Sequence, residues 1–237
     1  MEKNITIVAG LMVVAVWAAT IVARGGFVPS VPTLIGMAAV FLIYYGGSTC
    51  SKKEGNALAF AMVAAGVAVS YFVNASVFAV STIIAALLMV YSLKIRRTMI
   101  LGNLVRSGAV ALAFVCGGLV YNNLMMPLAV LIFFTVTGLE VYMTIDDAIS
   151  DHKYNEHSTA IKLGVIQTRL LGNIFLTIAI IYSFLPFFLG AGRTYLFFAI
   201  IADVLFIVAC IAPARYSSKM IQVGIALTVI AFAAGVV

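Results

Sequence analysis

Long runs of apolar residues dominate the sequence, separated by short polar or turn-forming stretches. A helix needs about 20 predominantly apolar residues to cross a bilayer, and each run is close to that length. A lipid-facing barrel would instead show short segments of alternating polarity. The pattern predicts an all-α membrane protein whose single domain, residues 1–237, has nine transmembrane helices. Their expected positions are 4–23, 33–49, 55–73, 75–93, 99–121, 125–145, 168–190, 194–212 and 219–237.

Three breaks between the runs carry turn or helix-start signals. Asn74 is a single polar residue between two apolar runs, which predicts a tight helical hairpin. Residues 121–123 (Tyr-Asn-Asn) separate the fifth and sixth runs. Residues 51–54 (Ser-Lys-Lys-Glu) have the S-x-x-E form of a capping box, which satisfies backbone amides at a helix start. We therefore expect the third helix to begin there.

The composition supports the membrane assignment and excludes several classes of protein. Of 237 residues, 64% are hydrophobic and 9% are charged, with a mean hydropathy of +1.18. Soluble domains are about half apolar and about a quarter charged. A water-soluble enzyme, a nucleic-acid binder and a disulfide-built secreted domain are therefore excluded. Cys50, Cys116 and Cys210 match neither a metal site nor a disulfide framework, so we expect them to be packing residues.

The basic residues predict an orientation in the cell membrane. With nine spans, one side holds only Arg24 and Arg193 outside the spans, and Arg106 lies within the fifth run. The other side holds the remaining eleven of the 14 basic residues: Lys3, Lys52, Lys53, Lys94, Arg96, Arg97, Lys153, Lys162, Arg169, Arg215 and Lys219. Cytoplasmic loops of membrane proteins carry an excess of Lys and Arg. We therefore predict a cytoplasmic N-terminus and an external C-terminus, and the net charge of +6 then reflects these loops rather than nucleic-acid binding.

Acidic residues gather at the predicted cytoplasmic end of the sixth helix. Glu140, Asp147 and Asp151 are separated by seven and four residues, so on a helix they share one face, whereas Asp146 is turned away. Grouped carboxylates favour a divalent cation, and Mg²⁺ held by one or two carboxylates commonly accompanies a phosphate-bearing substrate. A solvated acidic loop, balanced by Lys153 and its neighbours, is the alternative. The spacing alone leaves both interpretations open.

A basic cluster, Lys94, Arg96 and Arg97, lies on the same predicted side after the fourth helix. Arginine forms bidentate bonds with phosphate and diphosphate groups. These residues therefore either bind a phosphate or serve only to fix the topology. An acidic and a basic cluster on one membrane face favour an anionic, metal-assisted substrate.

Two ionisable residues fall inside predicted spans, Arg106 and Asp203. Charges within the membrane are costly and usually face a cavity or a partner. We expect Arg106 to pair with Glu140. The same two residues are the only features that suggest a transporter or channel. Many transporters are built from two repeated halves, and this sequence shows no such repeat.

Longer stretches are similar to a known family. The predicted helices four and five contain the stretches YSLKIRRTMILGNLVRSG and FVCGGLVY, and the region near the C-terminus contains SFLPFFLG and ADVLFIVA. LEVYMTIDDAISDHKYNEHSTAIKLG aligns without gaps with an aspartate motif of the form REIxKDxEDxxGDxxxGxxTxPxxxG. On these residues the chain resembles the UbiA superfamily of intramembrane prenyltransferases. The greatest likeness is to the group of archaeal digeranylgeranylglyceryl phosphate synthases.

The resemblance implies a nine-helix fold and a Mg²⁺-dependent transfer of a prenyl group from an isoprenoid diphosphate. In this group the acceptor is a glyceryl-phosphate lipid of archaeal ether-lipid synthesis, and two aspartate-rich motifs, after helices two and six, hold the metal. Glu140, Asp147 and Asp151 match acidic positions of the second motif, which implies catalytic roles and, for the two aspartates, Mg²⁺ binding. The expected phosphate-binding residues are Lys94, Arg96, Arg97, Asn103 and Lys153, of which Lys94 and Asn103 match the helix four to five signature.

The chain also departs from the family pattern. The leading aspartate of the second motif is Thr144, and its arginine and lysine are Leu139 and Met143. The first motif, NDxxDxxxD, is missing, and Glu54 is the sole carboxylate between helices two and three. Two functions therefore remain open. One is an active prenyltransferase, and the other is an inactive subunit that binds lipid or a partner in a membrane complex.

Overall fold

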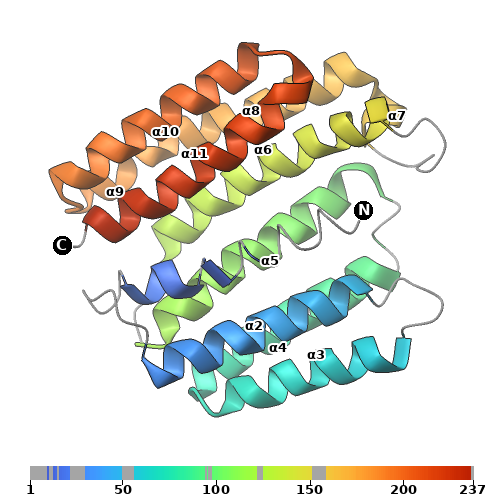
Figure 1. Cartoon of the computed structure of the whole chain (residues 1–237), viewed down its shortest axis with the longest axis vertical. Coiled ribbons are helices and arrows are strands. Elements are labelled where there is room, and N and C mark those ends of the chain that lie inside the picture. Colours follow the sequence, from blue (N-terminus) through green and yellow to red (C-terminus); the bar gives the residue numbers. More distant parts are fainter. Residues whose placement is uncertain are drawn as a thin grey trace. The chain divides into compact units, whose positions relative to one another are not determined.

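The computed structural model in Figure 1 describes most of the chain, and its regular structure there is helical. The described residues are 10, 13–14, 16–21, 30–49, 56–93, 95, 98–121, 125–150 and 159–235. Side chains are described for all of these except residues 48, 56, 93, 99, 147, 149, 150, 214 and 215.

The helices follow the apolar runs closely. Residues 16–21 are helical, within the first predicted span. The ten helices that follow are α2 (Val31–Thr49), α3 (Asn56–Tyr71), α4 (Ala75–Leu93), α5 (Met99–Leu119), α6 (Met126–Ser150), α7 (Thr159–Leu163), α8 (Val165–Ser183), α9 (Leu185–Phe188), α10 (Arg193–Ile211) and α11 (Ala214–Gly235). Two helix ends that differ from the sequence prediction are those of α8 and α6.

The first difference lies in the predicted span 168–190, which forms two helices. Helix α8 ends at Ser183, and α9 is a separate helix of four residues with Pro186 in its first turn. Proline lacks a backbone amide and its ring collides with the preceding turn, so it interrupts a helix. The second difference is that α6 runs five residues beyond the predicted end at 145 and includes Asp146 and Asp147.

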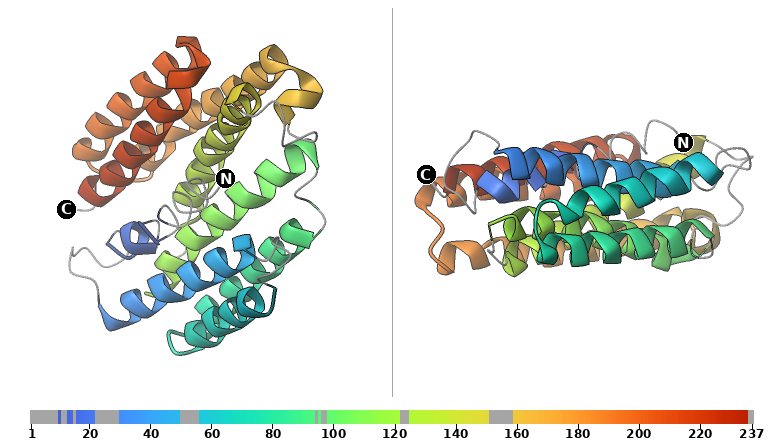
Figure 2. Two further views of the ribbon diagram at one scale, coloured as in Figure 1. Left: turned by 45° about the vertical axis from the view of Figure 1, so that its right-hand side comes forward. Right: turned by 90° about the horizontal axis from the view of Figure 1, so that it is seen from below.

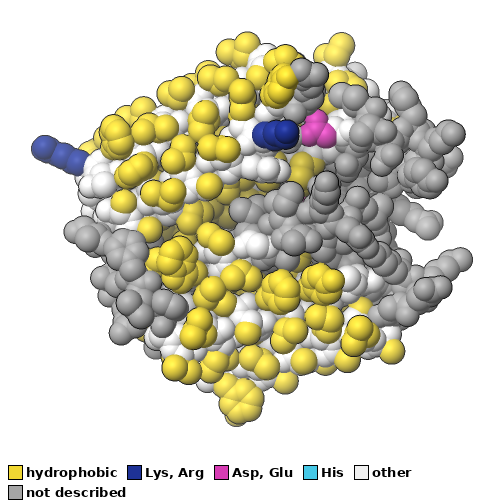
Figure 3. Space-filling model, viewed as in Figure 1, with side chains coloured by type: hydrophobic (Ala, Val, Ile, Leu, Met, Phe, Trp, Pro, Cys, Tyr) yellow, Lys and Arg dark blue, Asp and Glu magenta, His cyan; other side chains and the backbone are white. Residues whose placement is uncertain are grey.

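Six of the described helical segments are long and apolar enough to cross a membrane. They are Ala75–Ser92, Ile100–Leu119, Met126–Asp146, Val165–Phe188, Arg193–Ile211 and Tyr216–Gly235. Two shorter apolar helical segments, Val31–Gly47 and Ala57–Tyr71, add to them. The face in Figure 3 is largely apolar, with few charged side chains among its described residues. The protein is a multi-pass membrane protein, while the count of nine spans and their orientation stay predictions.

Contacts within the chain form two compact units. Unit 1 comprises residues 1–96 and 108–129, and unit 2 comprises residues 97–107 and 130–237. Helices α5 and α6 therefore each contribute residues to both units. The single domain over residues 1–237 stays a prediction.

Unit 1 is built around α2, α3 and α4, with α2 and α3 side by side in both figures. Glycines allow the close approach of α2 and α3. A Cβ atom at Gly46 would lie 2.7 Å from the carbonyl oxygen of Ala59, and one at Gly66 would lie 2.7 Å from that of Ala39. Small residues at such crossings let two backbones approach where water supplies no driving force.

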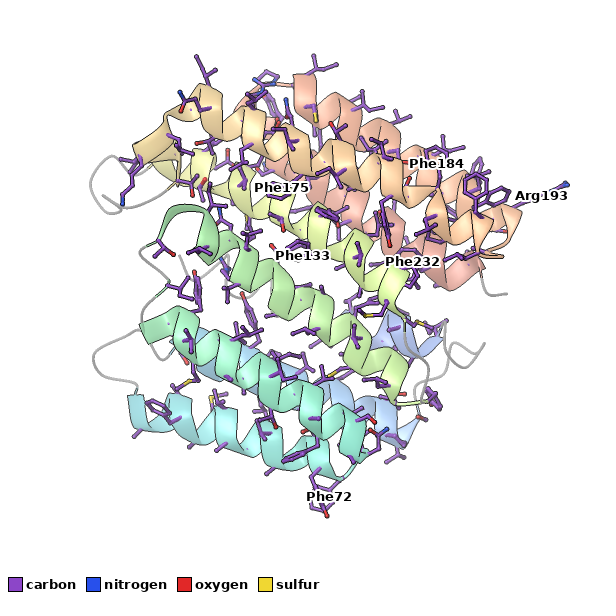
Figure 4. The ribbon with its side chains drawn as sticks, turned by 180° about the vertical axis from the view of Figure 1, so that it is seen from behind. Phe72, Phe133, Phe175, Phe184, Arg193 and Phe232 are labelled. Atoms are coloured by element: carbon purple, nitrogen blue, oxygen red, sulfur yellow. The ribbon has the colours of Figure 1, made fainter. Side chains whose placement is uncertain are left out.

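Asn74 forms the predicted hairpin between α3 and α4. Its Oδ1 accepts a bond from the Val77 amide at 2.7 Å and so caps α4. Its Nδ2 donates to the Leu119 carbonyl at the end of α5, at 2.8 Å. Phe72, in the same turn, points away from the helices in Figure 4.

Unit 2 contains α6 from residue 130 onward, α7 to α11 and the first two turns of α5. Helices α10 and α11 form a closely packed pair, visible in Figure 2. At one end of the pair, the rings of Tyr195 and Phe232 stack with their centroids 5.4 Å apart. At the start of α10, the exposed Arg193 extends away from the helices (Figure 4). Helix α11 of this pair contacts the polar end of α6 through Ser218.

Candidate functional site

The extended end of α6 places several acidic residues on one continuous helix. Glu140, Asp146 and Asp147 all lie within Met126–Ser150. Positions 140 and 147 are seven residues apart, which is about two helical turns, so the backbone register puts both on one face. The side chains of Glu140 and Asp146 are described, whereas that of Asp147 and the whole of Asp151 lie outside the described residues.

Glu140 forms an ion pair with Arg106 of α5. The Nη1 atom of Arg106 donates to Oε2 of Glu140 at 2.7 Å. The Glu140 side chain is only 2% exposed and the Arg106 side chain 18% exposed. The sequence prediction of this pair is confirmed. Because an isolated charge in a low-dielectric interior is very costly, each of these residues requires the other.

Asn103 lies one helical turn before Arg106 on α5. It is 7% exposed, and its backbone carbonyl accepts a bond from Ser107 Oγ at 2.8 Å. Its side-chain Nδ2 is buried and has no hydrogen-bond partner among the described residues. A buried donor without a partner costs about 1–3 kcal/mol, so this amide is an expensive feature to keep.

Asp146 faces a different neighbour from Glu140. The buried Ser218 of α11 donates from its Oγ to Oδ2 of Asp146, and the ammonium of Lys219 lies close enough to interact with the carboxylate. The expectation that Asp146 turns away from the face of Glu140 is confirmed. This contact ties the polar end of α6 to α11.

Helix α6 is also tied to α8. The buried Tyr142 donates from its hydroxyl to Oδ1 of Asn173. At Gly172, a Cβ atom would lie 2.8 Å from the Tyr142 ring, so the ring packs directly on the α8 backbone. These contacts fix the rotation of α6 about its axis in unit 2.

Sequence reasoning missed the role of Arg169, which it counted as a loop charge. Arg169 lies in α8. Its Nη2 donates to the carbonyl oxygens of Cys210 at 2.8 Å and Ala212 at 2.6 Å, at the end of α10. The last carbonyls of a helix lack intrahelical donors, and a cation there also meets the negative end of the helix dipole. Its place just inside an apolar run was the available signal.

Asp203, the other predicted intramembrane charge, has a local partner. It lies in α10, is buried, and accepts a bond from Ser183 Oγ at 2.6 Å. The backbone carbonyl of Ser183 in turn accepts a bond from the Tyr195 hydroxyl at 2.6 Å. These bonds link α8 to α10, which indicates a structural role for Asp203.

The described residues do not by themselves form a magnesium site. No group of three His, Cys, Asp or Glu side chains gathers among them. Oε2 of Glu140 is bonded to Arg106, and Oδ2 of Asp146 is bonded to Ser218. The other predicted site residues, Lys94, Arg96, Arg97, Asp151 and Lys153, lie outside the described residues.

Comparison with known proteins gives a consistent family. The sequence model of the UbiA prenyltransferase family matches residues 48–222. The digeranylgeranylglyceryl phosphate synthase of Sulfurisphaera tokodaii is 25% identical over 77% of this chain and 69% of its own length. That of Saccharolobus solfataricus is 28% identical over 68% of this chain, and the match spans 59% of its length. For the Sulfolobus acidocaldarius enzyme, the values are 32%, 55% and 48%.

Solved structures share the fold. A structure from work on digeranylgeranylglyceryl phosphate synthase in membranes superposes with a TM-score of 0.80, at 20% identity over 100% of this chain and 99% of that one. A UbiA homologue from Aeropyrum pernix gives 0.74, at 15% identity over 99% and 97%. A homologue from Archaeoglobus fulgidus bound to Cd²⁺ gives 0.67, at 14% identity over 95% and 97%. At these identities the likeness establishes the fold alone.

Proposed function

The chain belongs to the UbiA prenyltransferase family, and from that premise we propose that it is a prenyltransferase of the digeranylgeranylglyceryl phosphate synthase type. The proposed substrates are geranylgeranyl diphosphate and a glyceryl-phosphate lipid of archaeal ether-lipid synthesis. The curated relatives support this choice of substrates, although the matched region spans only 48% to 69% of the three quoted relatives.

One observation in the structure carries the proposal. Asn103, Arg106 and Glu140 place a buried amide and an ion pair with a buried carboxylate on α5 and α6, inside segments that are apolar enough to span a membrane. A helix that only fills space in a lipid bilayer gains nothing from such groups, because each is costly to desolvate. A polar substrate head that reaches into the membrane would give these groups a binding partner.

The proposed reaction balances as follows. The bond between C1 of the geranylgeranyl group and the diphosphate oxygen breaks, and diphosphate leaves with the electron pair. The hydroxyl oxygen of the glyceryl-phosphate lipid forms the new ether bond at C1, and its proton is released to water. Lys94, Arg96, Arg97, Asn103 and Lys153 are proposed to bind phosphate oxygens, as their charges and donors allow.

Mg²⁺ remains a proposal that rests on the family and on Asp147 and Asp151. When bound, it would offset negative charge on the diphosphate leaving group. A role for Glu140 at the site is likewise a proposal. Its bond to Arg106 supports a role in holding that guanidinium.

A second function has a specific observation in its favour. The hydroxyl of Thr144, which stands at the leading aspartate position of the motif, donates to the Val141 carbonyl of its own helix at 2.7 Å. It thus offers no carboxylate where the motif has one. Together with the missing first motif, this supports an inactive subunit that keeps the fold to bind lipid or a partner in a membrane complex.

The test is release of diphosphate from geranylgeranyl diphosphate by the purified protein. We expect release that requires both Mg²⁺ and geranylgeranylglyceryl phosphate. Reactions without metal and without acceptor are the controls. No release from well-folded protein, together with a partner that copurifies at fixed stoichiometry in mild detergent, would replace the enzyme with the inactive subunit.

A further inference from the structure

We propose that Asn103 and Arg106 form a subsite that binds an anionic phosphate oxygen, with Glu140 as the positioning residue that holds the guanidinium. This inference rests on the proposed function and adds Arg106 to its binding residues. The class of ligand is a phosphate ester, carried either by the prenyl diphosphate or by the acceptor lipid.

The two residues are arranged to act together. They are three residues apart on α5, so their side chains leave the same face of the helix within one turn. Both belong to unit 2, as does Glu140, so the whole subsite lies within one compact unit. The ion pair between Arg106 and Glu140 joins α5 to α6 within that unit.

The exposed fractions of the ion pair show which member meets a ligand. The Glu140 side chain is only 2% exposed, whereas the Arg106 side chain is 18% exposed. An incoming group therefore meets the guanidinium rather than the carboxylate. The planar guanidinium matches the geometry of phosphate oxygens, and its charge is retained at any physiological pH.

The Asn103 amide supplies an independent reason to expect an acceptor oxygen. Its Nδ2 is buried and has no hydrogen-bond partner among the described residues. A group that accepts hydrogen bonds would remove this cost on binding. Amide N–H and guanidinium N–H groups are both donors, so both can bind the oxygens of a phosphate.

Glu140 holds the guanidinium in place for this task. The 2.7 Å bond to Nη1 fixes one edge of the guanidinium, and the residues on either side of Glu140 in the chain, Leu139 and Val141, are fully buried. A restrained guanidinium loses less entropy when it binds a ligand than one that moves freely in a cavity. Glu140 acts through Arg106 in this view and does not touch the substrate.

The experiment measures both unliganded stability and ligand binding of the full-length protein in detergent. The probes are geranylgeranyl diphosphate, geranylgeranylglyceryl phosphate and, as a phosphate-free control, geranylgeraniol. The main variant is Asn103→Leu, which removes the buried amide but keeps the volume. The matched control is Asn173→Leu, because Asn173 accepts a hydrogen bond from Tyr142 in the same unit.

We expect Asn103→Leu to leave the unliganded melting temperature unchanged or raised, while weakening binding of at least one phosphate probe by roughly 10- to 100-fold. Asn173→Leu should lower the melting temperature and keep the affinities. The neutral double variant Arg106→Met/Glu140→Gln should weaken the same probe as Asn103→Leu. Geranylgeraniol should bind all variants equally.

Each outcome decides a separate question. Loss of affinity for geranylgeranyl diphosphate alone would identify the diphosphate as the ligand, and loss for the acceptor alone would identify the lipid phosphate. Wild-type affinities in both Asn103→Leu and the double variant would overturn the subsite but leave the proposed function standing. A fall in melting temperature for Asn103→Leu equal to that of Asn173→Leu would show a structural role instead. Failure of the wild-type protein to bind either phosphate probe would overturn the proposed function as well.

Discussion

Ser218 of α11 donates a hydrogen bond to Asp146 of α6, across 72 residues of sequence. The donor is buried, and the acceptor lies directly beside Asp147 in the chain. A contact between residues so far apart in sequence fixes how the polar end of α6 packs in unit 2.

This contact predicts a loss of stability on removal of the serine hydroxyl. Ser218→Ala should lower the free energy of unfolding by about 1–3 kcal/mol, because a partly buried carboxylate loses a donor. Unfolding in a denaturing-detergent titration measures it. Asp146→Asn keeps an oxygen that accepts the bond and should cost less. An equal cost for both variants would argue against the hydrogen bond as the cause.

The ion pair between Arg106 and Glu140 predicts strong coupling. Arg106→Met should destabilise the protein by about 3–5 kcal/mol, because it leaves a buried carboxylate without its charge partner. The double variant Arg106→Met/Glu140→Gln should recover a large part of that loss. Four unfolding titrations complete the double-mutant cycle. Additive effects of the two changes would contradict the pair.

The two hydrogen bonds of the Asn74 side chain can be tested separately. Asn74→Ala should cost about 1–2 kcal/mol, because it removes the cap of α4 and the bond to Leu119. Asn74→Asp keeps the oxygen that caps α4 and loses only the second bond, so it should cost less. Thermal unfolding in one detergent compares them. The reverse order would show that the bond to Leu119 dominates.

The bonds of Arg169 to the end of α10 indicate that this residue stabilises the folded protein rather than setting its orientation in the membrane. Arg169→Leu should destabilise the protein by about 1–3 kcal/mol, because the carbonyls of Cys210 and Ala212 lose a shared donor. The exposed Lys162→Leu removes the same charge from α7 and should have little effect. Parallel unfolding titrations test this. Equal effects of the two changes would assign the cost to charge alone.

Asp147 is the residue whose substitution we expect to lower turnover. Asp147→Asn should lower turnover by more than about 100-fold, since even groups that only support metal ligands are worth about 10- to 100-fold. Asp203→Asn is the control, because it keeps an oxygen for Ser183 and lies outside the proposed site. Diphosphate release measures both. Unchanged turnover in Asp147→Asn would remove this residue from the site.

Local patterns in the sequence were sufficient for much of the fold. The length of each apolar run predicted the membrane class and helix positions, and single polar residues such as Asn74 marked turns correctly. The helical period separated Glu140 from Asp146, and the cost of a buried charge predicted its pairing with Arg106. The interruption at Pro186 was missed, because an apolar run conceals a break that only the proline signals.

The sequence by itself thus determined where most of the helices lie and that Glu140 and Asp146 leave α6 in different directions, because these features depend on neighbours within a few turns. Only the tertiary structure decided that Ser218 bonds to Asp146, that Arg169 closes the end of α10, and that the side-chain Nδ2 of Asn103 is buried without a hydrogen-bond partner among the described residues. The physical reason is that almost every face of these helices is compatible with lipid. Hydrophobicity therefore does not specify which helix faces meet. Those contacts are set by how helices that are distant in sequence pack together.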